Sequence, residues 1–272
     1  MKYVIRKNGN EHAAGFNPVV GEDQDLIKLI NLGLLNLEVG QEYVFKNPVK
    51  ESLLVLLSGD CLIVSGTTEL GKMNRKSVFE QRASAIWSPP GVEVKVVAGE
   101  RTHLAVILSP VTAENGLGQG NRNPKLIMPS DVKVDVRGTG HCNREVHNIV
   151  DDSIPSYNLL VGETFNPPGN WSSYPPHKHE KDDPPIESQH EEVYYFKIEP
   201  EQGFALMRLY NDQRDDAVVV EDGDTVLLPN GFHPVAAPPG YSVYYLWILA
   251  GKSRQLRMND DPRHSWVRSF DS

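Results

Sequence analysis

Short apolar runs recur along the chain, and Gly, Pro, Ser or Asp residues separate them. Runs of this length that are rich in Val, Leu and Ile are typical of β-strands. They cover residues 53–57, 62–65, 92–97, 104–108, 132–136, 157–165, 192–198, 204–209, 217–220, 224–228 and 242–249. Gly59 and Gly203 are expected to form turns between consecutive runs. Residues 23–36 have some helical spacing, but Gly33 interrupts it, so this segment fits either a short helix or a strand. The pattern as a whole predicts an all-β fold.

The strand pattern pauses at residues 112–123, a segment rich in Gly and Asn. We therefore expect two domains, over residues 1–120 and residues 121–272. Each half contains a similar turn, SPPG at residues 88–91 and LPNG at residues 228–231, with a further strand after it. Self-similarity of this kind indicates a duplicated unit. Two packed antiparallel β-sandwich halves are the simplest architecture.

Composition narrows the class of protein. The chain has 272 residues, of which 39% are hydrophobic, enough for a substantial core. Its net charge of −9 argues against a nucleic-acid partner, which usually needs a basic face. No apolar run approaches the roughly 20 residues that span a bilayer, and the first ten residues lack the apolar segment of a signal peptide. Two cysteines, Cys61 and Cys142, provide no disulfide framework, so the cytoplasm is the expected compartment.

The candidate chemistry lies in the second half. His177 and His179 are two residues apart, so on a strand both imidazoles project from one face. Glu192 opens an apolar strand further on, and His233 follows a Pro/Gly turn. Three imidazoles and a carboxylate suit one divalent cation, Zn, Mn, Fe, Ni or Co, with positions left for substrate. Two residues just before Glu192 could take its place as a ligand: His190 and Glu191.

The spacing of these residues resembles the two motifs of the cupin superfamily, HxH followed by Glu and then Gly-x5-Pro-x-Gly-x-His at residues 223–233. Cupins are small antiparallel jelly-roll barrels with the metal inside. Twelve residues separate His179 from Glu192, a longer gap than is usual, and they include the acidic, Pro-rich segment 180–189. In the first half no His occurs between His12 and His103, and Glu93 takes the place of the turn-borne His. That half therefore resembles a degenerate cupin with a structural or dimerising role.

A closer resemblance covers nearly the whole chain, and residues 162–250 carry its specific motifs. The segments GNWSSYPPHKH at 169–179, EEVYY at 191–195, QGFA at 202–205 and GFHPV at 231–235 are similar to those of the 5-deoxy-glucuronate isomerase family of bacterial inositol catabolism. The resemblance implies a metal-dependent isomerase that converts 5-deoxy-D-glucuronate into 5-dehydro-2-deoxy-D-gluconate. It also implies four metal ligands, His177, His179, Glu192 and His233.

Aldose–ketose isomerisation needs a group that moves a proton. The substrate that the resemblance implies also carries a carboxylate, for which a planar arginine is the natural partner. Candidates for the first are Glu163, His190 and Tyr245, and for the second Arg208, provided that Met207 packs outward, or Arg144. Segment 180–189 is a candidate lid.

The expected partner is a small deoxy-uronate substrate. The chain could form a homo-oligomer, and we expect it to bind neither nucleic acid nor a membrane. Other interpretations are a relative of the 4-deoxy-5-keto-uronate isomerases of pectin breakdown, a cupin dioxygenase, which would consume O₂, and a non-catalytic sugar-binding cupin.

Overall fold

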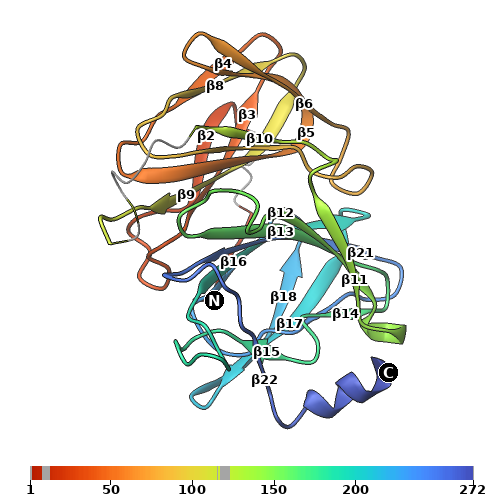
Figure 1. The fold of residues 1–272 in the computed structure, drawn as a ribbon. Helices are drawn as coiled ribbons and strands as arrows, with labels where there is room; N and C mark the ends of the chain where they lie inside the picture. The colour runs from red at the N-terminus through yellow and green to blue at the C-terminus, as the bar shows by residue number, and fades with distance from the viewer. Residues whose placement is uncertain (1, 8–12, 115, 117–122, 272) are drawn as a thin grey trace. The chain divides into compact units, whose positions relative to one another are not determined.

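The computed structural model describes residues 2–7, 13–114, 116 and 123–271. Within these residues the regular elements are antiparallel β-strands and two short 3₁₀ helices, η1 (Gly140–Cys142) and η2 (Ser265–Asp271) (Figure 1). The all-β prediction is confirmed. The ambiguous segment 23–36 contains a strand over Asn31–Leu37 and no helix. No helix in the described part of the chain is long and apolar enough to cross a membrane.

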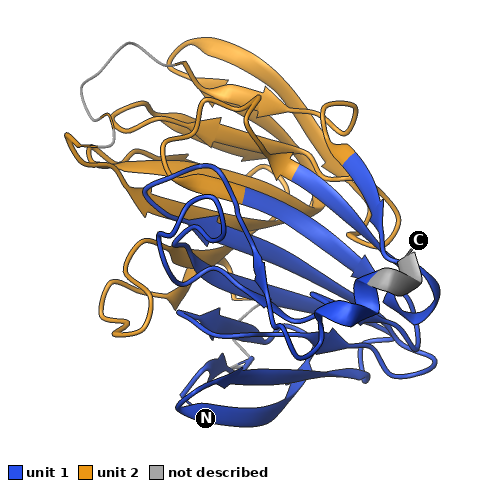
Figure 2. Ribbon diagram, turned by 60° about the horizontal axis from the view of Figure 1, so that its bottom comes forward, with its two compact units in different colours: residues 1–7, 134–148, 161–272 blue, residues 8–133, 149–160 orange. Residues whose placement is uncertain are grey.

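The chain forms two compact units, coloured separately in Figure 2. Unit 1 comprises residues 1–7, 134–148 and 161–272, and unit 2 comprises residues 8–133 and 149–160. This division differs from a single cut after residue 120. The N-terminal strand pairs with a strand of unit 1. Residues 149–160 belong to unit 2, where the buried carboxylate of Glu51 binds their backbone.

Unit 2 is built around one long strand, β5. The strands of unit 2 are β2 (Gly15–Val20), β3 (Asn31–Leu37), β4 (Glu42–Phe45), β5 (Lys50–Ser65), β6 (Thr68–Arg75), β7 (Ala85–Ser88), β8 (Val94–Ala98), β9 (Thr102–Pro110) and β10 (Lys125–Ile127). The first part of β5 pairs with β7 and β9, and its second part pairs with β6 and β8. The predicted turn at Gly59 is therefore wrong, because β5 continues through it. Gly59 has φ +110°, and a Cβ there would lie 2.5 Å from the Arg101 carbonyl oxygen, so glycine lets the strand bend at this point.

A buried carboxylate holds residues 149–160 in unit 2. Glu51 on β5 is fully buried and accepts a hydrogen bond from Trp87 Nε1 at 2.8 Å. It also accepts hydrogen bonds from the backbone N–H groups of Tyr157 (2.9 Å) and Asn158 (2.7 Å). Three donors around one buried carboxylate offset its desolvation. Unit 2 therefore depends on a chain segment that follows residue 120.

Unit 1 contains two facing sheets. Its strands are β1 (Val4–Ile5), β11 (Lys133–Arg137), β12 (Arg144–Val150), β13 (Leu159–Asn166), β14 (Trp171–Ser172), β15 (His177–Lys178), β16 (Glu191–Glu199), β17 (Phe204–Asn211), β18 (Arg214–Glu221), β19 (Thr225–Leu228), β20 (Val235–Ala236), β21 (Ser242–Ala250) and β22 (Asn259–Asp260). One sheet has the order β1-β19-β16-β21-β13-β12-β11, and the other has the order β14-β20-β17-β18. The short strands β15 and β22 form a separate pair.

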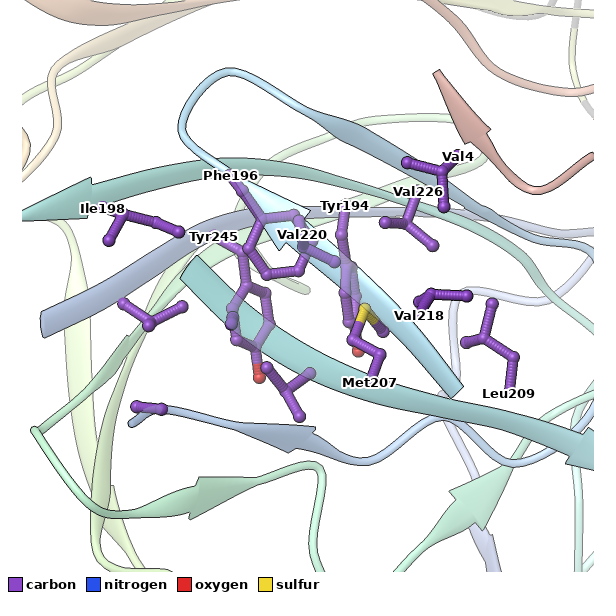
Figure 3. Packing of buried hydrophobic residues seen from close by; sticks show 14 of the residues in the cluster. Val4, Tyr194, Phe196, Ile198, Met207, Leu209, Val218, Val220, Val226 and Tyr245 are labelled. Carbon is purple, nitrogen blue, oxygen red and sulfur yellow. The ribbon is translucent and has the colours of Figure 1, made fainter. Parts of the chain in front are cut away.

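The core of unit 1 lies between these two sheets (Figure 3). β16 contributes Tyr194, Phe196 and Ile198 at every second position, and the opposite sheet contributes Met207 and Val218, among others. Side chains that alternate along a strand point to opposite faces. Glu192, two residues before Tyr194, therefore faces the same interior as the core, where the ligand cluster forms.

Candidate metal centre

Two connections bring distant histidines to the start of β16. His190 N donates to the His179 carbonyl at 2.9 Å, which holds the end of the HxH segment beside β16. The turn after β19 contains Gly231 at φ +84°, where a Cβ would lie 2.7 Å from the Tyr210 carbonyl oxygen. Only glycine fits this left-handed, crowded position. The turn then delivers His233 to the interior.

Three of the four predicted ligands converge on one point. His179 Nε2 lies 3.1 Å from Glu192 Oε2, and His233 Nε2 lies 3.3 Å from the same oxygen. Potential ligand atoms of these three buried residues all lie within 4.8 Å of one another. The half-buried His177 adjoins them, with its ring centroid 5.1 Å from that of His233 and 6.4 Å from that of His179.

Backbone carbonyls fix the tautomers of two of these imidazoles. His179 Nδ1 lies 3.1 Å from the His190 carbonyl oxygen, and His233 Nδ1 lies 2.9 Å from that of Gly231. A carbonyl oxygen only accepts hydrogen bonds, so each Nδ1 carries a proton and Nε2 is the ring atom left to bind a cation. Burial lowers the pKa of His179, but its hydrogen bond to the Glu192 carboxylate outweighs burial and raises the pKa, so a cation would take the place of the Nε2 proton. His233 Nε2 is buried and makes no hydrogen bond to any residue that the structure describes. The residues present therefore fit a divalent metal with N and O ligands.

The carboxylate of the cluster is ionised. Burial raises the pKa of Glu192, but the neighbouring imidazoles of His179 and His233 outweigh burial and lower its pKa to about 2. Burial lowers the pKa of His177 well below its ordinary value, and the imidazoles of His233 and His179 add to that effect. The centre thus combines one anionic oxygen donor with a neutral imidazole, a set that suits a borderline divalent cation.

A pocket of about 350 Å³ opens beside the cluster, and His177, His179 and Glu192 contribute to its wall. Tyr194 and Tyr245 also line it, with their rings stacked at 4.5 Å. The volume lies at the lower end of the range for small-molecule sites.

A serine in a strained conformation joins the two tyrosines. Ser173 has φ +48°, a region that non-glycine residues seldom adopt. Its Oγ lies 3.1 Å from Tyr194 Oη and 3.5 Å from Tyr245 Oη. Burial raises the pKa of Tyr245, and the nearby hydroxyl of Ser173 offsets part of that rise. The phenol therefore keeps its proton at neutral pH.

The structure does not bring Glu163 to this pocket. Thr164 lines the pocket, and its neighbour Glu163 on β13 points to the opposite face of the sheet. There the buried Glu163 carboxylate accepts a hydrogen bond from Tyr244 Oη at 2.8 Å. Glu163 therefore has a structural role, because its buried carboxylate binds Tyr244 and does not reach the pocket.

Arg208 also lies outside the pocket. Met207 is 2% exposed and packs inward, so Arg208 on the same strand points outward. Its guanidinium forms two hydrogen bonds of 2.7 Å to Asp215 and lies over the ring of Tyr210. Arg208 could reach the interior only if Met207 pointed outward, and Met207 points inward. Arg144, the other candidate, does line the pocket.

The rival ligands occupy other positions. His190 Nε2 donates to the Ser253 carbonyl at 2.7 Å and is not part of the cluster. Glu191 pairs with Ala250 across the ladder and alternates away from Glu192. No second group of ligating side chains occurs in the described residues of unit 2. Glu93 in that unit is exposed, and its Oε2 lies 3.9 Å from Lys46 Nζ.

The candidate lid, residues 180–189, folds around Glu187. The buried Glu187 carboxylate accepts hydrogen bonds from the backbone N–H groups of Glu180 (2.7 Å) and Lys181 (3.0 Å) and from Asn259 Nδ2 (2.9 Å). The pocket wall includes none of residues 180–189. Residues Leu256, Met258 and Arg268 of the C-terminal segment line it instead. Sequence reasoning missed these three, because no motif surrounds them.

The fold and site together define a class, an all-β cupin with two barrel units and, among the residues that the structure describes, one His/Glu cluster. Solved oxalate decarboxylases share this fold: the enzyme from Lactobacillus farciminis aligns with a TM-score of 0.66 at 12% identity, over 91% of this chain and 84% of that one. The chain itself belongs to the KduI/IolB family, whose model matches residues 4–267. The resemblance inferred from the sequence motifs is thereby confirmed.

Several relatives are similar over most of their length. A protein from Geobacillus kaustophilus named 5-deoxy-glucuronate isomerase is 44% identical over 222 residues, which cover 80% of this chain and 78% of the relative. A protein of the same name from Bacillus licheniformis is 36% identical and aligns over 98% of this chain and 99% of its own. The crystal structure of an IolB-like protein from Salmonella typhimurium LT2 aligns with a TM-score of 0.88 at 31% identity, over 98% and 99% of the two chains.

Proposed function

We propose that this chain is a 5-deoxy-glucuronate isomerase, which converts 5-deoxy-D-glucuronate into 5-dehydro-2-deoxy-D-gluconate in myo-inositol catabolism. The observation that supports this most is the match to the KduI/IolB family over residues 4–267, together with relatives of that name that align almost end to end. The reaction is an intramolecular aldose–ketose isomerisation. We expect it to take place in the cytoplasm, with a homo-oligomer as a possible assembly.

His179, Glu192 and His233, with His177 beside them, would hold one divalent cation. When bound, such a cation supplies Lewis acidity, which polarises a carbonyl group and makes the neighbouring C–H more acidic. The support for this assignment is the convergence of buried donor atoms and the orphaned Nε2 of His233. Zn, Mn, Fe, Ni and Co all suit this donor set.

Tyr245 is the proton donor in the proposed mechanism. Isomerisation removes a proton from C2 of the aldose, adds one to C1 and shifts a hydroxyl proton between the two oxygens. Of the three proton-transfer candidates, Tyr245 alone lines the pocket among the described residues, and burial keeps its phenol protonated. Its hydroxyl can therefore donate a proton to the aldehyde oxygen and regain one from the C2 hydroxyl, so that the phenol ends in its starting form. The Ser173 Oγ lies 3.5 Å from this phenol oxygen.

An NMR time course tests the proposal. Metal-analysed protein is incubated with 5-deoxy-D-glucuronate, with and without a chelator. We expect loss of the aldehyde or hemiacetal signal and growth of a ketone signal, abolished by chelation and restored by one divalent metal. No conversion by fully metallated protein would reject the substrate. Consumption of O₂ in the same samples would favour the dioxygenase alternative.

A further inference from the structure

Positive charge gathers in the pocket of an otherwise acidic protein. Arg137, Arg144 and Arg268 all line it. Glu192, which belongs to the metal cluster, is the one carboxylate among the lining residues that the structure describes. The pocket therefore offers more basic groups than its own acids neutralise, although the whole chain has a net charge of −9.

Arg144 differs from the other two arginines in its partners. Arg137 is paired with Asp135 at 3.3 Å, and Arg268 donates to Asp260 at 2.8 Å. Within the described residues Arg144 has no carboxylate partner, and its Nη1 donates to the carbonyl oxygen of Cys142 at 2.9 Å. The remaining donors of this half-buried guanidinium are available to a ligand.

The backbone of the preceding turn holds Arg144 in place. Gly138 has φ +73°, and a Cβ at this position would lie 2.7 Å from Arg144 Nη1 and 2.3 Å from the Cys142 carbonyl oxygen. The chain thus passes directly against the guanidinium, which only glycine permits. Burial lowers the pKa of Arg144, but a guanidinium stays charged at any physiological pH. A half-buried charge with a fixed position and no acidic partner is what a binding site for an anion requires.

Arg144 and Glu192 both line the pocket, and they come from strands that are not neighbours in the sheet. In the sheet, β13 and β21 separate β12, which carries Arg144, from β16, which carries Glu192. Three strand spacings place the two backbones about 14 Å apart. An open-chain hexuronate has its aldehyde at one end and its carboxylate at the other. The metal cluster would take the first end, and the second end needs a cationic group on the far side of the same pocket.

We propose that Arg144 binds the carboxylate of the substrate, and that Arg137 and Arg268 add positive potential at that end of the pocket. The identity of the substrate rests on the proposed function, whereas recognition of a sugar carboxylate does not. The planar guanidinium can bind a carboxylate through two parallel hydrogen bonds, which gives both affinity and orientation. Arg144 thus determines specificity for an acid over the corresponding neutral sugar.

Binding of two stable probes tests this assignment. D-glucuronate and D-glucose, which differ at C6, are titrated by calorimetry into wild type, Arg144→Gln, Arg144→Lys and Arg208→Gln. The matched control is Arg101→Gln, an exposed arginine of unit 2 that is paired with Glu38. We expect wild type and the control to prefer glucuronate by about 10- to 100-fold, the range for a charge-assisted hydrogen bond. Arg144→Gln should bind both sugars alike, and Arg144→Lys should keep part of the preference because it lacks the planar fork.

Three outcomes would overturn the assignment: an unchanged preference in Arg144→Gln with a native melting curve, loss of preference in Arg208→Gln instead, or no preference in wild type. Turnover of 5-deoxy-D-glucuronate by the same samples separates this inference from the proposed reaction. A carboxylate preference that depends on Arg144, without any conversion, rejects the reaction and keeps the binding role. Conversion that is equally fast in wild type and Arg144→Gln rejects the binding role and keeps the reaction. The expected result is a kcat/KM about 10- to 100-fold lower in Arg144→Gln.

Discussion

At the scale of single residues, two backbone carbonyls decide how the metal centre works. The carbonyls of His190 and Gly231 each accept the Nδ1 proton of a histidine, and both Nε2 atoms consequently face Glu192. Such outer contacts orient a ligand before the metal arrives, so that little ordering entropy remains to be lost on binding. The same contacts explain why the rival His190 does not serve as a ligand: its backbone supports His179, and its ring is bound to Ser253.

Removal of a ligand imidazole should weaken metal binding. We expect His179→Ala and His233→Ala each to lower the affinity for a divalent metal by at least about 10-fold, since even the loss of an outer contact costs that much. The measurement is a competitive titration against a chromophoric chelator. The control is His141→Ala, an exposed histidine on η1. Full metal content and full activity in both ligand variants would reject the site.

Loss of the Tyr245 hydroxyl should slow turnover and leave the metal in place. We expect kcat to fall by about 100-fold or more in Tyr245→Phe, in line with the contribution of a positioned proton donor. Metal content is determined on the same sample by elemental analysis. Tyr43→Phe, a half-buried tyrosine of unit 2, is the matched control. A Tyr245→Phe variant as active as wild type would exclude the phenol from the reaction.

Asp151 should make the stability of unit 2 sensitive to acid. Burial raises the pKa of this carboxyl, but hydrogen bonds from Lys133 and Ser153 outweigh burial and lower the pKa to about 2, against an ordinary value of 3.8. Its contribution is therefore complete above the ordinary value and is lost as pH falls through about 2. Because the Lys133 partner is exposed, we expect Asp151→Asn to cost only about 1 kcal/mol near neutral pH. Melting curves at several pH values should show the difference from wild type shrink below about pH 4 and vanish only below about pH 2.

At the scale of elements, strand alternation explains both the successes and the failures of sequence reasoning. The positions of β16, β17, β19 and β21 follow directly from apolar runs between turn residues, and all four are confirmed. Which side of a strand faces the pocket is harder to predict. Both faces of β13 are buried, so the position of Glu163 gives no sign of its direction. Longer-range pairing decides it.

The segment before β16 shows a similar limit. Its acidic, Pro-rich sequence suggests a solvated lid, yet one of its carboxylates is buried and bound to backbone N–H groups. The partner that completes this arrangement, Asn259, lies 72 residues away from Glu187 in the sequence. No local pattern could predict the contact.

Glu187 should therefore be important for stability, unlike the exposed Asp182 of the same segment. We expect Glu187→Ala to lower the free energy of unfolding by about 1–3 kcal/mol, because two backbone N–H groups lose their acceptor. Metal affinity should fall as well, since His179 immediately precedes this segment. The measurements are denaturant unfolding and a metal titration. The exposed Asp182, replaced by Ala, serves as the control and should change neither quantity.

At the scale of the whole molecule, the order of the chain does not match the order of the units. Val4 pairs with Val226 of β19, although more than 200 residues separate them. The Tyr3 carbonyl accepts a hydrogen bond from Leu227 N at 2.8 Å. Unit 2 in turn needs residues 149–160. A two-half organisation follows from the repeated turn patterns, whereas these crossed segments pair through backbone contacts that the sequence does not encode locally.

The two halves should not fold when they are separated at residue 120. A fragment of residues 121–272 lacks β1, which covers one edge of the seven-stranded sheet, and we expect it to lack a cooperative melting transition. Mixing it with a fragment of residues 1–120 should restore both the transition and metal binding. Circular dichroism and a metal titration provide the readouts. A fragment 121–272 that melts cooperatively and binds metal as tightly as the full chain would contradict this expectation.

The pairing of β1 with β19 has a consequence for the newly made polypeptide. β1 emerges from the ribosome before β19, and it cannot pair until residue 226 of β19 has also emerged. Unit 2 has all of its segments once residue 160 is out, so it can fold first. The turn that carries His233 emerges only after β19, and so later than every segment of unit 2. A chain released before that point would contain every segment of unit 2 but no complete His/Glu cluster, so we expect it to bind metal more weakly than the full chain.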